Sequence, residues 1–130
     1  MKYILMMHAP RGKGDWAVLN WPPEDRKAHI DFMKRLNKEL RDSSELVGAE
    51  GLAGPAQARV VRARKGGGVP EVTDGPFPEA KEFLAGYWIV EVESAARAYE
   101  IAARASAAPG PGGTPLNLSI EVREVLGAAG

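Results

Sequence analysis

Residues 73–94 read TDGPFPEAKEFLAGYWIVEVES and combine a rigid corner, a strand and the start of a helix. Gly75 and Phe77 each precede a proline, which disfavours the right-handed helical region for both residues. Each proline also fixes its own φ near about −65° and removes a backbone N–H. We therefore expect residues 75–78 to form a short extended corner, with the ring of Phe77 buried as its anchor.

The residues on either side of this corner carry charge. Pro78 is suited to the first position of a helical turn, and such a turn would carry Glu79, Lys81 and Glu82. Asp74 precedes the corner, where aspartate commonly accepts backbone N–H bonds in a turn. The segment therefore predicts either a site that holds carboxylates and an ammonium group in fixed relation, or a structural bracket.

The segment after the corner predicts a strand and then a helix. Residues 84–93 alternate, so that Trp88, Val90 and Val92 face one way while Tyr87, Ile89 and Glu91 face the other. Ser94 is a favourable N-cap for a helix that follows it. One of the two faces of this strand should lie on a side of the sheet that no helix covers.

The N-terminal half predicts a strand and a long helix. Residues 2–8 form a nearly continuous apolar run, typical of a central strand. Pro22 and Pro23 are followed by acidic residues, which favours a helix start, and the helix should run to about Asp42. Its apolar stripe consists of Phe32, Met33, Leu36 and Leu40. His29 falls on the same stripe, four residues before Met33.

The remaining segments complete a repeated pattern. Residues 45–52 predict a second strand, and residues 57–64 and 69–73 predict a hairpin around the glycines at 66–68. A Pro/Gly-rich loop over 106–118 leads to a last strand at 119–126. The order β-α-β, hairpin, β-α-β indicates an α+β, ferredoxin-like split βαβ fold with an inserted β-hairpin. Helices would cover one face of its sheet, and a second subunit is the simplest cover for the other, which predicts a homodimer.

The central run, together with APGPGG at 108–113 and IEVREV at 120–125, resembles the YCII-related family and in particular its DGPF branch. The resemblance runs from the first strand to Val125. It implies a ferredoxin-like fold that pairs into a dimeric α/β barrel, here as one domain over residues 1–130. Related dimeric α/β barrels include isomerases, lyases and monooxygenases, so the resemblance specifies an architecture more closely than a reaction.

Composition excludes several classes of function. Seventeen basic and seventeen acidic residues cancel, which argues against a nucleic-acid partner. The chain has no cysteine and only two histidines, without a zinc-type spacing, so we expect neither a metal site nor a cofactor. The N-terminus lacks a signal-peptide pattern and no apolar stretch reaches membrane-spanning length. We therefore expect a cytoplasmic protein without a membrane partner.

His29 is the leading catalytic candidate, because an unperturbed imidazole titrates near about pH 6.5. Its His-x-x-Phe-Met context is similar to a His-x-x-aromatic-Leu motif of the YCII-related group. The resemblance implies an active-site pair of histidine and aspartate, and Asp74, at the head of the proline corner, is our choice for the aspartate. The alternative is that His29 is a packed helix histidine bonded to backbone and that Asp74 only fixes a turn.

Four further side chains are candidates for ligand binding. Lys81 and Glu79 accompany the proline corner, although both could equally belong to a solvated turn. Arg123 matches a Glu-Val-Arg pattern of the family and could hold a carboxylate through its planar guanidinium, or form an interface ion pair. His8 ends the first strand, where it could reach the rim of a pocket.

Together these features predict a small cofactor-independent enzyme or a small-molecule-binding protein with a His-centred pocket. The ligand would be a small polar or anionic organic molecule, with a proton moved by His29 if the protein is an enzyme. The alternative is a non-catalytic regulatory module that acts through a protein partner. The resemblance motivates this alternative, since members of the DGPF branch are often associated with sigma factors.

Overall fold

A computed structural model of the 130-residue chain describes residues 1–11, 18–77 and 80–128. Two α-helices are present in this part of the chain, α1 (Pro23–Asp42) and α2 (Ala95–Ser106). The strands are β1 (Lys2–Pro10), β2 (Leu46–Gly51), β3 (Arg59–Arg62), β4 (Glu71–Asp74), β5 (Glu82–Glu91) and β6 (Ile120–Glu124). Short 3-10 helices lie at Val18–Asn20, Pro55–Gln57 and Pro111–Gly113.

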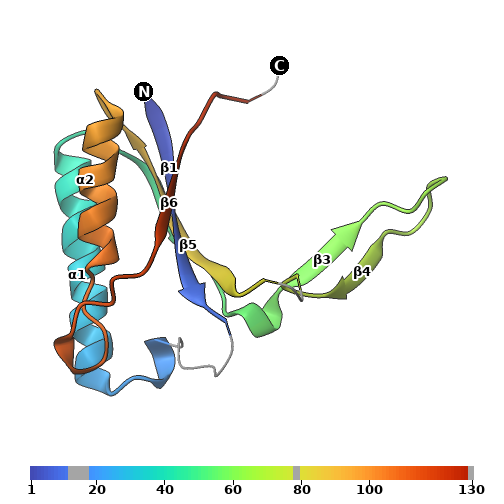
Figure 1. Ribbon diagram of the computed structural model, residues 1–130, viewed down its shortest axis with the longest axis horizontal. Helices are drawn as coiled ribbons and strands as arrows, with labels where there is room; N and C mark the ends of the chain where they lie inside the picture. Colours follow the sequence, from blue (N-terminus) through green and yellow to red (C-terminus); the bar gives the residue numbers. More distant parts are fainter. Residues whose placement is uncertain (12–17, 78–79, 129–130) are drawn as a thin grey trace.

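The main sheet has four strands in the order β2-β5-β1-β6, and every neighbouring pair is antiparallel. Both helices lie on the same side of this sheet (Figure 1). Two strand-helix-strand units that share one antiparallel sheet make a ferredoxin-like α+β fold. The predicted fold class, including a hairpin inserted between the second strand and the strand of residues 84–93, is confirmed.

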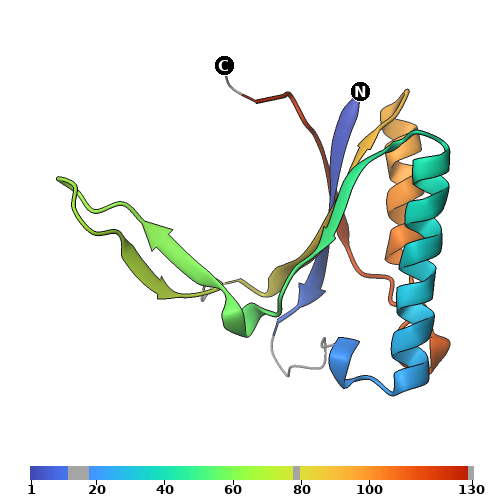
Figure 2. The same cartoon turned by 180° about the vertical axis from the view of Figure 1, so that it is seen from behind.

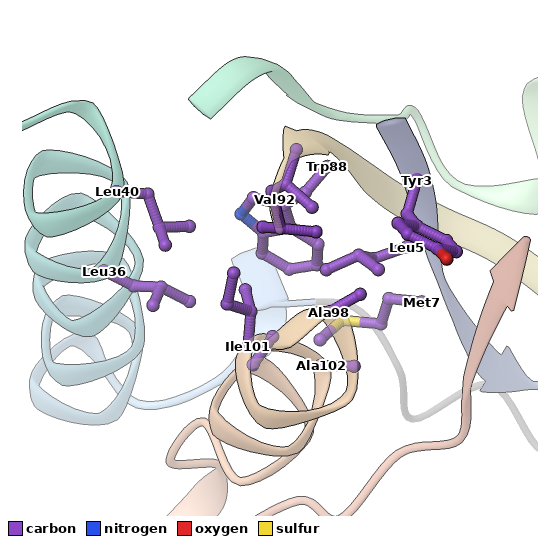
Figure 3. Packing of buried hydrophobic residues seen from close by; sticks show 12 residues of the cluster. Tyr3, Leu5, Met7, Leu36, Leu40, Trp88, Val92, Ala98, Ile101 and Ala102 are labelled. Atoms are coloured by element: carbon purple, nitrogen blue, oxygen red, sulfur yellow. The ribbon is translucent and has the colours of Figure 1, made fainter. Parts of the chain in front are cut away.

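The core lies between the sheet and the helices. Strand register places Leu5 directly opposite Trp88, and both are buried. Figure 3 shows these side chains beside Leu36 of α1 and Ile101 of α2. Burial of such large apolar side chains contributes about 1.5–3 kcal/mol each, which fixes both helices on this face.

In the described part of the chain, no helix lies over the other face of the sheet (Figure 1). Strand pairing places Ile4 opposite Ile89 and Met6 opposite Tyr87, and all four side chains are only partly buried. They alternate with the buried residues of the same strands, so they point away from the helices. We call this surface, centred on Ile4, Met6, Tyr87 and Ile89, the open face.

Caps and an ion pair define the ends of the helices. Pro23 begins α1, and Ser43 ends it with its hydroxyl donating to the Leu40 carbonyl oxygen at 3.1 Å. Ser94 caps α2 as predicted, since its Oγ accepts from the backbone N–H of Arg97 at 3.3 Å. The Arg97 guanidinium donates through Nε and Nη2 to the carboxylate of Glu45, both at 2.8 Å, which ties α2 to the segment just before β2.

The inserted hairpin forms a separate sheet of two strands, β3 and β4. It projects from the body on the side of the main sheet opposite the helices, and the two opposed views agree on this (Figures 1 and 2). We call residues 59–74 the arm. At its root, the backbone N–H of Gly75 donates to the Ala58 carbonyl oxygen at 2.9 Å.

The structure corrects two predictions for the proline corner. Lys81 and Glu82 do not form a helical turn, because β5 already begins at Glu82, which pairs with Pro10 of β1. Phe77 is 60% exposed and does not anchor the corner as a buried ring. Its carbonyl oxygen instead accepts from Arg11 Nη1 at 2.6 Å, so a backbone contact fixes this segment. Pro78 and Glu79 lie outside the described residues.

Among the helices of the described segments, none is long and apolar enough to cross a membrane.

Candidate functional site

A cavity of about 720 Å³ opens between α1 and the edge of the sheet formed by β2 and β5. This volume falls within the range of about 300–1,000 Å³ that is typical of small-molecule sites. Aromatic and aliphatic side chains form much of its wall, including Phe83, Trp88, Met33 and Ile30. The polar residues that line it are Asn20, His29, Lys34, Asn37, Glu50, Gln57 and Tyr87.

His29 projects from α1 into the wall of this cavity and is buried. Its Nδ1 lies 3.0 Å from the carbonyl oxygen of Pro109, and its ring meets that of Trp21 edge-on at 5.3 Å between centroids. A carbonyl oxygen can only accept, so Nδ1 must carry the proton of this bond. The neutral imidazole is therefore the Nδ1–H tautomer, in which Nε2 holds a lone pair.

Burial determines the charge state of this imidazole. Removal from water lowers the pKa of His29 below its ordinary value, since burial disfavours the charged form. The hydrogen bond to Pro109 opposes this effect and is the smaller of the two. The net lowering favours neutral His29 near pH 7, as a proton acceptor requires.

The Pro/Gly-rich loop after α2 holds the Pro109 carbonyl in place. Pro109 forms an isolated bridge with Pro115, and the backbone N–H of Gly110 donates to the Thr114 carbonyl oxygen at 2.8 Å. The N–H of Leu116 donates to the Ala108 carbonyl oxygen at 2.9 Å. The loop is thus closed on itself, and it serves to position the His29 ring.

A second polar contact in the cavity wall joins Trp88 to Asn37. Trp88 Nε1 donates to Asn37 Oδ1 at 2.8 Å, which satisfies the indole N–H and orients the amide. The Asn37 nitrogen, Nδ2, is a donor with two hydrogens. On the opposite wall, Gly86 allows β5 to approach β2 closely, since a Cβ at Gly86 would lie 2.9 Å from the Glu50 carbonyl oxygen.

The cavity and its histidine fall inside a recognised family domain. Residues 1–113 match the YCII-related domain, a span that runs from β1 through Pro109. The chain belongs to the YCII-related family. No curated protein matches it.

Of the predicted site residues that the structure describes, His29 alone lines the cavity of this YCII-related protein. Asp74 lies on the arm, where its side chain is 95% exposed and stands 3.7 Å from Arg59 Nε. In a single chain the Nδ1 partner of His29 is therefore the Pro109 carbonyl, and Asp74 is not brought beside the imidazole.

The other predicted ligand-binding residues lie elsewhere. His8 Nε2 is 3.3 Å from a carboxylate oxygen of Glu121, between β1 and β6 on the open face. Arg123 is on β6 opposite Ile4, also on the open face. The side chain of Lys81 is exposed, and its carbonyl oxygen accepts from the backbone N–H of Arg11 at 2.8 Å. Glu79 is not among the described residues.

Sequence reasoning missed Asn37, Trp88 and Pro109 as residues of the site. Asn37 lies one turn after Met33 on the helix stripe, and this polar residue beside an apolar stripe was an available signal. No signal in the sequence pairs Pro109 with His29. In the described part of the chain, no group of three or more metal-binding side chains comes together.

Proposed function

We propose that this protein binds a small organic molecule in the cavity beside α1, either as a cofactor-independent enzyme or as a binding protein, with His29 as its central polar group. The observation that carries this proposal is the placement of a buried histidine, held in one tautomer by Pro109, in the wall of a cavity of ligand size.

The lining residues favour a molecule with an apolar body and a polar or anionic group. Trp88 and Phe83 offer aromatic surface, whereas Asn37 Nδ2 and the Lys34 ammonium are donors. In an enzyme, neutral His29 would take a proton from the bound molecule and return it at a later step. Asp74, Lys81, Arg123 and His8 have no role in the cavity of one chain under this proposal.

A ligand screen tests the proposal. Ligand-observed NMR with a library of small carboxylates, lactones and phenols would be run on the wild type, His29→Gln and His8→Gln. We expect at least one class to bind the wild type and His8→Gln, with at least tenfold weaker binding to folded His29→Gln. The control is matched because His8 is the other histidine of the chain and lies on the open face. Equal binding to all three proteins would remove His29 from the site.

A wild type that binds none of these molecules would favour the alternative, a regulatory module acting through a protein partner such as a sigma factor. Co-purification of one sigma factor with the wild type, tested by a reconstituted binding assay, would then support that alternative.

We also propose that a second copy of the chain covers the open face. Four partly buried apolar side chains, Ile4, Met6, Tyr87 and Ile89, occupy its centre. Uncovered apolar surface of this kind commonly marks an interface, and a two-fold axis lets the same surface serve both copies. Sedimentation equilibrium at micromolar concentration checks this proposal, and a mass of 13.9 kDa at all concentrations would contradict it.

A further inference from the structure

The arm has no hydrophobic core of its own. All of residues 61–74 are exposed, and the two central valines are 63% (Val61) and 59% (Val72) exposed. Val61 pairs directly with Val72, so both side chains lie on one face of the hairpin. Val69 near the tip is 79% exposed.

Such a hairpin is incomplete as an isolated unit. A two-stranded ribbon without a packed face is marginally stable in water, and both of its edges present unpaired backbone groups. The four residues of β3 nevertheless pair in register with the four of β4. A surface that covers the valine face would supply the missing apolar contact.

The direction of the arm indicates which surface that is. The arm leaves the body on the side of the open face, away from α1 and α2 (Figures 1 and 2). A second copy seated on the open face would therefore occupy the space beside the arm. In a two-fold dimer each arm would reach the other copy, and the contact would be made twice.

The arm is basic, whereas the open face carries the carboxylates of Glu50 and Glu121 as well as the cation of Arg123. The arm carries four cations, Arg59, Arg62, Arg64 and Lys65, against two carboxylates, Glu71 and Asp74. Neither Arg62 nor Lys65 forms an ion pair within the described segments. Glu50, opposite Tyr87 at the edge of the open face, is exposed and likewise has no ion-pair partner among the described residues. Opposite charges of this kind favour a specific register between two copies.

We infer that the arm is a clasp that packs its Val61–Val72 face on a second copy of this chain, next to the open face of that copy. The inference rests on the homodimer proposed above and adds to it a contact outside the main sheet. A nucleic acid is the competing occupant of a basic ribbon, but the balanced charge of the chain and the carboxylates of β4 disfavour it.

Two arm variants and two comparison variants test the clasp by analytical ultracentrifugation over a dilution series. Val61→Lys/Val72→Lys places charge on the valine face. A second variant replaces residues 59–74 with Asn-Gly, which the backbone hydrogen bond between Gly75 and Ala58 makes feasible as a tight turn. Thr73→Lys is the matched control, because Thr73 is exposed on the opposite face of the same strand. Ile89→Lys probes the open face itself.

We expect both arm variants to raise the dimer dissociation constant at least tenfold over the wild-type value, while circular dichroism shows an intact main domain. The dissociation constant of Thr73→Lys should stay within about threefold of the wild-type value. A dimer that persists unchanged in either arm variant but is lost in Ile89→Lys would overturn the clasp and leave the dimer standing. A monomeric wild type would overturn both proposals, and binding of a DNA duplex by that monomer would assign the arm to nucleic acid.

Discussion

His29 Nδ1 lies 3.0 Å from the carbonyl oxygen of Pro109, 80 residues further along the chain. This contact joins a helix of the first β-α-β unit to the loop that closes the second. It fixes both the tautomer and the orientation of the imidazole. A water molecule in the same place would hold the ring less firmly. The loop after α2 is therefore part of the candidate site, although it lacks regular secondary structure over most of its length.

The lowered pKa of His29 predicts a pH dependence of folding stability. Because burial holds this pKa below its ordinary value of 6.5 in the folded state, the unfolded chain binds more protons as the pH falls through that value. The contribution of His29 to the free energy of unfolding is complete above about pH 6.5 and is lost as the pH falls through the folded pKa. Urea unfolding of the wild type and His29→Gln between pH 7.5 and about 5 measures it.

We expect the wild type to lose more stability than His29→Gln across this pH interval. Parallel stability profiles of the two proteins would contradict a neutral, buried imidazole at this position.

The ion pair between Glu45 and Arg97 predicts a second, more acidic transition. The Arg97 guanidinium lowers the pKa of Glu45 from 4.5 to about 2, so the contribution of this carboxylate is present above pH 4.5 and lost toward about pH 2. Glu45→Gln should cost about 1–2 kcal/mol at pH 7, allowing for partial solvent screening of Arg97. Lys38→Gln, which breaks the exposed pair with Asp42, is the control and should cost less than about 0.5 kcal/mol. Equal losses of stability in the two variants would show that the bidentate pair contributes no more than an exposed ion pair.

Most of the fold could be predicted because its signals are local. The apolar stripe of α1 and the alternation of residues 84–93 each report a periodicity within a few residues of sequence. The helical turn predicted after the proline corner is wrong because pairing with a distant strand sets the structure of this segment. Glu82 pairs with Pro10 of β1, and this ladder extends β5 back to the residues that were expected to form a helical turn.

The site was less predictable than the fold for the same reason. The burial of His29 could be predicted from its place on the helix stripe. Its hydrogen-bond acceptor is a backbone carbonyl in an irregular loop, where no side-chain pattern marks it. Asp74 was chosen for its neighbours in sequence, but it lies on the exposed arm and is not among the residues that line the cavity.

Gly86 predicts a steric requirement in the wall of the cavity. A Cβ at this position would lie 2.9 Å from the Glu50 carbonyl oxygen, so Gly86→Ala must push β5 and β2 apart. We expect a loss of about 1–3 kcal/mol in the free energy of unfolding, measured by urea denaturation. Gly48→Ala is the matched control on β2, because no atom lies within 4 Å of its ideal Cβ, and it should change stability by less than about 1 kcal/mol. Similar values for the two variants would show that the close approach of the strands is not required.

A substitution at Gly110 should change the pKa of His29 while leaving the histidine itself in place. A Cβ at Gly110 would lie 2.5 Å from Leu116 Cδ2 and 2.9 Å from its Cγ, so Gly110→Ala should displace the loop and with it the Pro109 carbonyl. Since the hydrogen bond to Pro109 raises the pKa of His29, its loss should lower that pKa further in an NMR titration of the ring protons. Leu116→Ala removes the clashing atoms, and the double variant should restore the titration toward that of Leu116→Ala alone. An unchanged His29 titration in folded Gly110→Ala would mean that the loop does not control the imidazole.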